Sequence, residues 1–328
     1  MSIISNPGSA IEPVVITRQF DDIDACAKAI QPLNVTANQL TPGLFMGKIN
    51  FADFRGLKFI HVTHNQAVTF KSSKSPDEVR FSTLFKNNQT EVLAHGCPLK
   101  KHDLFGFDPT RESDIIAGQD THIVIASLNF QVFQSLAADM GYDLGRKFLQ
   151  QNLIRFHPVT LRSLKTYYQE ITEIFHQKPE FFKESSISSL IGENFLPLLI
   201  DTLGKHTRKN HHIPKPFCRY SIVKKTEEIA RSSLDKPLSL KQICQELATS
   251  SSALSYGFQE IFGLSPMAYI KIQRLNGVRR TLKNADPQTT MVMRIAHQWG
   301  FWSAGHFTRN YQEMFGELPS ETLRNYKN

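Results

Sequence analysis

The sequence FQEIFGLSP at residues 258–266 returns 53 positions later as YQEMFGELP at residues 311–319. Five of the nine positions are identical, and both segments begin with an aromatic residue. Self-similarity at a fixed period near this length indicates one supersecondary unit used twice. The C-terminal part of the chain is therefore predicted to contain two copies of one small helical unit.

The first copy has the sequence signals of two helices joined by a turn. Ser239 and Gln242 have the spacing of a capping box, in which each side chain satisfies a free backbone N–H of the other. The polar run at residues 249–252 offers a turn and a new N-cap, and Gly263 suits a left-handed helix end. These signals predict a helix-turn-helix unit.

The second copy follows the same plan. Gly300 is expected to turn the chain, Ser303 to cap the next helix and Gly316 to end it. Between the copies, residues 265–283 open with Ser-Pro and predict one long helix. Gly277 lowers helix stability by about 1 kcal/mol relative to alanine, so close packing is expected there.

Positive charge is concentrated at the same end of the chain. The formal net charge is +8; residues 1–204 contain 19 Lys and Arg against 21 Asp and Glu, whereas residues 205–328 contain 19 against 9. Clustered positive charge favours binding to a phosphate backbone or an anionic membrane surface. A solvated basic surface without a partner is the plain alternative.

The N-terminal part has a different pattern. Short apolar runs between residues 40 and 128, separated by Gly, Pro, Asn and Asp clusters, favour a small β-sandwich or cupin-like barrel. Between residues 132 and 203 the apolar period becomes helical, and the stripe that includes Leu164, Tyr168 and Ile171 is typical of a core face or a dimer seam.

A length of 328 residues indicates about two domains. The basic stretch from Lys205 to Pro216 contains two prolines and predicts a linker, in which the His211-His212 pair is solvated. The prediction is an α+β fold with four parts. Residues 1–130 are expected to form a β-rich sensor domain, and residues 131–204 a helical dimerisation or connector region. Residues 205–219 are expected to form a basic, proline-containing linker, and residues 220–328 an all-α DNA-binding domain with two helix-turn-helix units joined by a long helix.

Composition excludes several classes of protein. The chain has no apolar run near the roughly 18 residues that cross a bilayer and no N-terminal signal pattern. Its four cysteines are widely spaced and form no C-x-x-C pair. We expect a soluble cytoplasmic protein that does not bind membranes, with no cofactor, no metal and no disulfide framework.

The C-terminal residues resemble the AraC/XylS class of bacterial transcription regulators over about residues 220–326. The residues that carry the resemblance are Phe258, residues 262–266, Tyr269 and Arg274-Leu275 in the first unit, and Ile295-Ala296, Gly300-Phe301, His306-Phe307, Arg309, Tyr311, Phe315-Gly316, Pro319 and Arg324 in the second. Gly300-Phe301-Trp302 with Gly305, Tyr311 and Pro319-Ser320 is similar to the branch that contains the ethanolamine-operon regulator. Residues 39–43 with Phe45 and Gly47 are similar to AraC-like sensor domains.

The resemblance implies a DNA-binding transcription regulator that is not an enzyme. Members of the family usually activate transcription, and their N-terminal domains bind a small-molecule effector, dimerise, or do both. The implied partners are double-stranded DNA, RNA polymerase, a small-molecule effector and a second copy of the chain. The sequence names no effector-pocket residue.

In helix-turn-helix units the second helix lies in the major groove, and basic side chains hold phosphates. The candidates for contact with base edges are Ser251, Ser252, Ser255, Tyr256 and Gln259 in the first unit and Ser303, Ala304, His306, Arg309 and Asn310 in the second. The phosphate candidates are Lys241, Arg274, Arg279 and Arg294. The family commonly has an arginine at the place of Tyr256, whereas Arg309 matches the family and can bond guanine or a phosphate.

Two alternatives stay open. The first is a DNA-binding regulator that answers to a protein partner and binds no effector. The second is a cupin-like metal enzyme built on His61, His64, His95, His102 and His122. His61 and His64 are three apart and point to opposite faces of a strand, and no familiar catalytic motif is present, so no catalytic residue is assigned.

Overall fold

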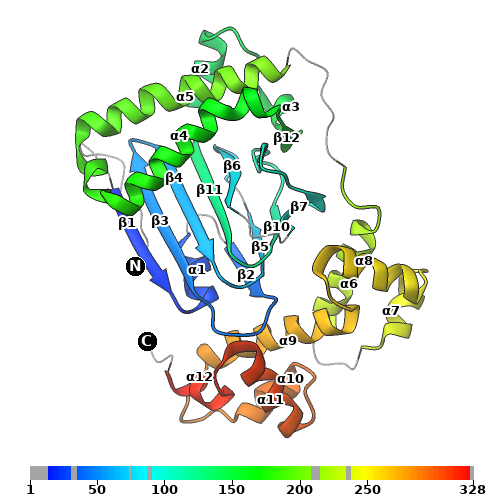
Figure 1. Ribbon diagram of the computed structural model, residues 1–328. Coiled ribbons are helices and arrows are strands. Elements are labelled where there is room, and N and C mark those ends of the chain that lie inside the picture. Colours follow the sequence, from blue (N-terminus) through cyan, green and yellow to red (C-terminus); the bar gives the residue numbers. More distant parts are fainter. Residues whose placement is uncertain are drawn as a thin grey trace. The chain divides into compact units, whose positions relative to one another are not determined.

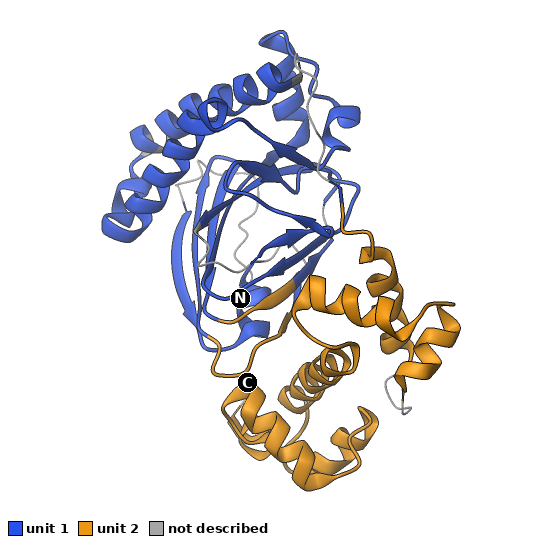
Figure 2. Cartoon of the chain, turned by 45° about the vertical axis from the view of Figure 1, so that its right-hand side comes forward, with its two compact units in different colours: residues 1–37, 46–65, 70–215 blue, residues 38–45, 66–69, 216–328 orange. Residues whose placement is uncertain are grey.

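The computed structural model describes residues 14–30, 35–73, 75–86, 91–207, 215–233 and 238–325. The chain divides into two compact units (Figure 2). The first contains Met1–Ala37, Met46–Asn65 and Phe70–Lys215, and the second contains Asn38–Phe45, Gln66–Thr69 and Pro216–Asn328. The predicted His211-His212 pair lies outside the described residues. Within the described part of the chain, no helix has the length and apolar character needed to span a membrane.

Two sheets form the β-rich part of the chain (Figure 1). The larger sheet has seven strands in the order β1 (Val14–Phe20), β3 (Gly47–Phe54), β4 (Leu57–His64), β11 (Thr121–Asn129), β6 (Glu78–Lys86), β9 (Asp103–Phe105) and β12 (Leu153–Arg155). The smaller has five, in the order β2 (Val35–Gln39), β5 (Val68–Ser72), β10 (Ser113–Ala117), β7 (Leu93–Ala94) and β8 (Cys97–Pro98). The β-rich prediction for this part of the chain is confirmed.

The hairpin between β3 and β4 sets the register of the larger sheet. Arg55 and Gly56 have φ angles of 56° and 98°, a conformation suited to a tight two-residue turn. Asp53 Oδ1 accepts a hydrogen bond from Gly56 N at 2.7 Å. This register places Phe59 and His61 on one face of β4, because alternate residues of a strand share a face.

Helices cover that face. They are α2 (Phe130–Asp139), α3 (Arg146–Leu149), α4 (Pro158–Gln177), the 3-10 turn η1 (Pro179–Lys183) and α5 (Ser185–Thr207), and all of them place buried side chains in one cluster with Phe59. The buried residues of α1 (Ile23–Ala29) do not belong to this cluster. In Figure 1, α4 and α5 run across the larger sheet. The rings of Tyr168 on α4 and Phe195 on α5 lie 5.9 and 4.7 Å from the ring of Phe59.

The apolar stripe of α4 is core. Leu164, Tyr168 and Ile171 are buried in one cluster with the sheet, and Tyr168 Oη donates to the carbonyl of Phe81 at 3.0 Å. Between the two interpretations of this stripe, the structure therefore favours a core face over a dimer seam. Helix α5 ends at Thr207, so the predicted linker begins inside this helix.

The second unit is mainly helical. Its helices are α6 (Tyr220–Ser232), α7 (Leu240–Glu246), α8 (Ser251–Phe262), α9 (Pro266–Lys283), α10 (Val292–Gln298), α11 (Ala304–Phe315) and α12 (Pro319–Asn325). The capping box of Ser239 and Gln242 is present, and Gly263 and Gly316 end α8 and α11 with φ angles of 66° and 71°. Ser303 occupies the N-cap of α11, but its side chain makes no capping hydrogen bond. Its φ and ψ are extended, so the position is as predicted and only the side-chain bond differs.

Helix α9 makes a close contact at Gly277. A Cβ at this position would overlap the six-membered ring of Trp299, whose Nε1 donates to Thr281 Oγ1 at 3.1 Å. Only glycine leaves room for the indole ring against the helix backbone, which is the close packing expected from the sequence.

A buried side chain of α9 also holds an extended segment within the second unit. Asn276 Oδ1 accepts from the backbone N of Gln39 at 3.0 Å, and Asn276 Nδ2 donates to the carbonyl of Gln39 at 2.9 Å. The Asn276 amide thus forms hydrogen bonds with both the N–H and the carbonyl of Gln39, as the backbone of a neighbouring strand would. Residues 38–45 therefore belong to the structure of this unit.

We expect Gly277→Ala to lower the free energy of unfolding by about 1 to 3 kcal/mol, because the added methyl group displaces the Trp299 ring. Gly305→Ala is the matched control, since a Cβ at Gly305 in α11 meets nothing within 4 Å. The control should be neutral or more stable by up to about 1 kcal/mol. Both tryptophans of the chain, Trp299 and Trp302, lie in the second unit. Urea unfolding followed by tryptophan fluorescence measures this unit, and equal stability of the two variants would contradict the packing argument.

In the first unit, His61 is fully buried and is held by a polar chain. Thr17 Oγ1 donates to Asn50 Oδ1 at 3.0 Å, and Asn50 Nδ2 lies 3.2 Å from His61 Nδ1. Burial, followed by the positive charges of His122, His176 and Lys48, lowers the pKa of His61 from 6.5 to about 3. The folded protein therefore keeps this ring neutral.

Because the unfolded chain protonates His61 at about pH 6.5 and the folded chain only near pH 3, stability falls as the pH decreases through this window. The loss from this residue is about 1.4 kcal/mol per pH unit. We expect His61→Leu to remove this part of the pH dependence, measured by urea unfolding with circular dichroism between pH 7 and about pH 4.5. The exposed control His306→Gln should keep the full slope; a parallel slope in His61→Leu would refute the assignment.

Candidate nucleic-acid interface

Helix α8 has one buried face and one exposed face. Ser250 caps it, with its Oγ accepting from Ala253 N at 3.1 Å. The side chains of Leu254, Phe258 and Ile261 are buried, and the ring of Phe258 packs against Tyr269 at 5.4 Å. Packing on this side fixes the rotation of α8 and turns its polar side outward.

The five sequence candidates on α8 meet in one shallow hollow. Its volume is about 470 Å³, and it is lined by Leu240, Ser251, Ser252, Ser255, Tyr256, Gln259 and Ser265. Three of these are serines of α8, whose small side chains present hydroxyl groups. The helical period therefore brought together all five residues that the sequence singled out.

Tyr256 has a basic neighbour that the sequence did not reveal. Its side chain is 65% exposed, and the guanidinium carbon of Arg219 lies 5.8 Å from the centre of its ring. Arg219 comes from the residue before α6, 37 positions earlier in the chain. A cation over an aromatic face is an attractive arrangement. Positive charge is thus present beside the position where an arginine was expected.

In helix α11 the buried face is formed by Phe307, Tyr311, Met314 and Phe315. Four of the five sequence candidates, Ser303, Ala304, His306 and Arg309, are exposed. The fifth, Asn310, is half-buried, and its Oδ1 accepts from Lys271 Nζ at 3.2 Å.

Trp302 is a further exposed aromatic residue at the start of α11 and was not among the contact candidates. Its side chain is 64% exposed, and its ring stacks on His297 at 5.1 Å. A large aromatic side chain that stays in solvent beside a helix N-terminus was detectable in the sequence only as part of the family motif.

The four phosphate candidates differ in their surroundings. Lys241 and Arg294 are exposed. Arg274 is half-buried and donates to the carbonyl of Ser233 at 3.0 Å. Arg279 is 6% exposed, and its Nε donates to Glu317 Oε1 at 2.9 Å. The last two side chains thus have partners inside the unit.

The enzyme alternative receives no support from the histidines. The ring of His61 lies near His122 and His176, whereas the ring of His64 contacts Phe70 on the smaller sheet. This confirms that His61 and His64 point to opposite faces. Among the residues that the structure describes, no group of three or more His, Cys, Asp or Glu side chains is arranged to hold a metal ion.

Residues 243–325 match the family model of a helix-turn-helix domain. The chain is similar to a probable thc operon regulatory protein of Rhodococcus erythropolis, with 32% identity over 42% of this chain and 41% of that protein. It is also similar to the XylDLEGF operon transcriptional activator 2 of Pseudomonas putida, with 29% identity over 42% of this chain and 88% of that protein. The match thus spans less than half the length of the first relative.

Solved structures are similar to this chain as well. One is the crystal structure of a probable AraC family transcriptional regulator from Rhodopseudomonas palustris, 35% identical, which covers 33% of this chain and 99% of that chain with a TM-score of 0.30. Another is the AraC-like transcriptional activator CuxR, 14% identical over 87% of this chain and 100% of that chain, with a TM-score of 0.42.

The relatives are transcription regulators and not enzymes. The family match at residues 243–325 lies over the same helices whose exposed faces carry the candidate contacts. Residues 243–325 of this chain therefore form a helix-turn-helix domain, and through it the chain is similar to bacterial transcription regulators of the AraC/XylS type.

Proposed function

We propose that this protein is a sequence-specific DNA-binding transcription regulator that inserts α8 and α11 into successive segments of the major groove. The observation that carries the proposal is the hollow on α8, in which all five predicted contact residues lie together on the exposed side of a well-packed helix. The match of residues 243–325 to a helix-turn-helix domain supports it.

The two helix pairs, α7 with α8 and α10 with α11, are proposed to be two helix-turn-helix units. Helix α9 lies between them in the chain and has 18 residues, which corresponds to about 27 Å at 1.5 Å per residue. One turn of DNA is about 34 Å. A straight connector of this length suits two recognition helices that enter the groove one turn apart.

The two helix pairs have different side chains for base recognition. Arg309 on α11 is exposed and can form two hydrogen bonds to guanine O6 and N7. On α8, Tyr256 with Arg219 beside it offers an aromatic surface and a guanidinium in place of a single arginine. We propose that the helix pair α7 and α8 reads its bases through serine hydroxyls, Gln259 and this pair of side chains.

The remaining parts of the proposal concern regulation. Similarity to a protein named as a transcriptional activator supports activation, with RNA polymerase as the partner. The first unit is proposed to bind an effector and to pair two copies of the chain in the cytoplasm. The four domain boundaries predicted from the sequence and the ethanolamine-operon branch stay predictions.

The first test is selection of pooled genomic DNA fragments by the full chain at about physiological salt. We expect enrichment of one motif with two half-elements about one helical turn apart. Arg309→Ala should weaken binding to this motif by about 1 to 3 kcal/mol and relax the preference at one base pair. Arg162→Ala, which removes an exposed arginine of the first unit, is the control for loss of charge. Equal weakening on every DNA sequence would contradict base reading by Arg309.

The phosphate contacts are tested by salt dependence. Arg294→Ala and Lys241→Ala should each reduce the slope of log K against log salt by about 0.9, uniformly across DNA sequences. Arg279→Met should instead lower the free energy of unfolding by about 1 to 3 kcal/mol, because it leaves Glu317 without its partner. A changed salt slope with unchanged stability in Arg279→Met would place Arg279 on DNA.

A further inference from the structure

A group of basic side chains lies on the larger sheet of the first unit, beside the last turn of α4. Lys48 on β3 and His122 on β11 are both direct cross-strand partners of Thr63 on β4. Directly opposite residues of an antiparallel pair share a face, so these three side chains stand in one row. His176 of α4 joins them, with its Nδ1 3.4 Å from Lys48 Nζ.

His61 lies in the next row and has a donor without an acceptor. Asn50 Oδ1 accepts from Thr17, which orients the Asn50 amide so that Nδ2 donates to His61 Nδ1. A neutral imidazole that accepts at Nδ1 carries its proton on Nε2. This Nε2 is buried and has no hydrogen-bond partner.

The free N–H of His61 is directed toward the basic group. Its Nδ1 faces Asn50 on β3, so Nε2 is at the other side of the ring, toward β11. The ring centre lies 5.6 Å from those of both His122 and His176. An unmet buried donor costs about 1 to 3 kcal/mol, and an acceptor atom between these rings would recover it.

The electrostatics favour an anionic acceptor. After burial, the causes that lower the pKa of His61 are its electrostatic interactions with His122, His176 and Lys48. Burial and Lys48 also lower the pKa of His176. Lys48 therefore supplies positive charge beside these rings, and a bound anion would pair with it.

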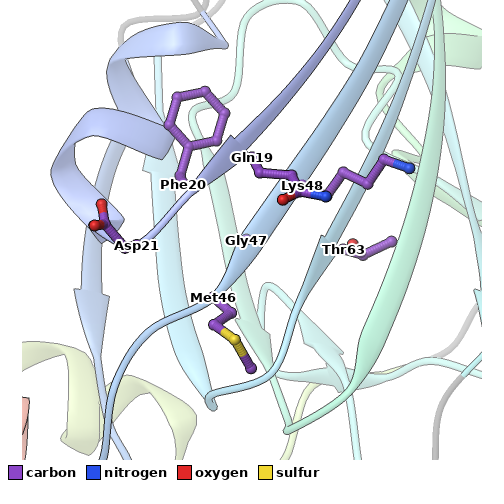
Figure 3. Close-up of a pocket in the computed structure, with 7 residues that line it drawn as sticks. All are labelled: Gln19, Phe20, Asp21, Met46, Gly47, Lys48 and Thr63. Carbon is purple, nitrogen blue, oxygen red and sulfur yellow. The ribbon is translucent and has the colours of Figure 1, made fainter.

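Lys48 lines an open hollow of about 570 Å³, which is within the usual range of small-molecule sites. Its lining is Gln19, Phe20, Asp21, Met46, Gly47, Lys48 and Thr63. In Figure 3, the Lys48 side chain extends from its strand on the same side as Thr63, and Asp21, the acid of the lining, lies at the far end beside Phe20. A ligand entering here meets Lys48, whose Nζ lies 3.4 Å from His176 Nδ1.

We propose that Lys48, His61, His122 and His176 bind a small anion that presents two acceptor oxygens, a carboxylate or a phosphate. One oxygen accepts from His61 Nε2 and the other from Lys48 Nζ. We assign this group as the effector site, an assignment that rests on the proposed regulatory function. Its ligand is a small organic acid or a phosphate compound.

The test follows the histidine ring signals of the full chain by NMR during titration with sodium butyrate and with inorganic phosphate. Butyramide is the uncharged control, and sodium chloride controls for ionic strength. We expect the His61 signals to shift and saturate with at least one anion, and the more effective anion identifies the ligand class. Saturable shifts with neither anion, or the same shifts with butyramide or chloride, would overturn the proposal.

Variants distinguish binding at this site from a general effect of positive charge on the protein. Lys48→Met should weaken the affinity for the effective anion about tenfold, the loss of one charge-assisted hydrogen bond. Lys147→Met, which removes an exposed lysine of α3, should leave the affinity unchanged. Equal affinity in Lys48→Met would refute the site. Because Lys48 is partly exposed, its replacement leaves the core intact, which circular dichroism checks.

The effector role of this site is tested by the affinity for DNA. The affinity of the full chain for its selected DNA is compared with and without saturating anion, and we expect it to change. Unchanged DNA affinity with saturable anion binding would remove the effector role. Failure of DNA selection itself would remove the proposed function and leave the NMR result for the anion site standing.

Discussion

The second unit depends on the close packing of helix α9. Helices α8, α10, α11 and α12 all contact α9, so this one helix positions both helix pairs. Its backbone approaches the indole ring of Trp299 at Gly277, where no larger residue fits, and Asn276 at the preceding position anchors the backbone of Gln39. Because packed interfaces resist continuous deformation, the orientation of α8 and α11 is set by these contacts and not by the turns alone.

Aromatic rings give the two repeated segments their buried sides. Phe258 and Phe262 pack on Tyr269 in the first copy, and Phe307, Tyr311 and Phe315 form a continuous row in the second. Each pair of rings adds about 0.5 to 1.5 kcal/mol beyond the area that it buries. This burial turns the serines of α8 and Arg309 of α11 outward. The repeat is thus a packing device that presents polar side chains on its opposite side.

The first unit has a conventional apolar core that also encloses polar side chains, and His61 is one of these. Phe59, Tyr168 and Phe195 pack between the larger sheet and its helices, whereas His61, two residues further along β4, is buried with an unmet donor. Buried polar groups are usually paired, and a bound acceptor would pair this donor. Its neighbours are basic, which makes the binding of an anion the chemical role that we propose.

The sequence by itself determined the features that depend on local order along the chain. Neighbours three or four residues apart determine the capping box at Ser239, the glycine at the end of α8 and the outward-facing residues of that helix. Local patterns also determine the division into a β-rich and a helical part. Only the tertiary structure decided which distant side chains meet: Arg279 with Glu317, Arg219 with Tyr256, and His61 with His122 and His176. These pairings depend on strand register and helix packing, which bring together residues tens of positions apart, and no local period in the sequence encodes them.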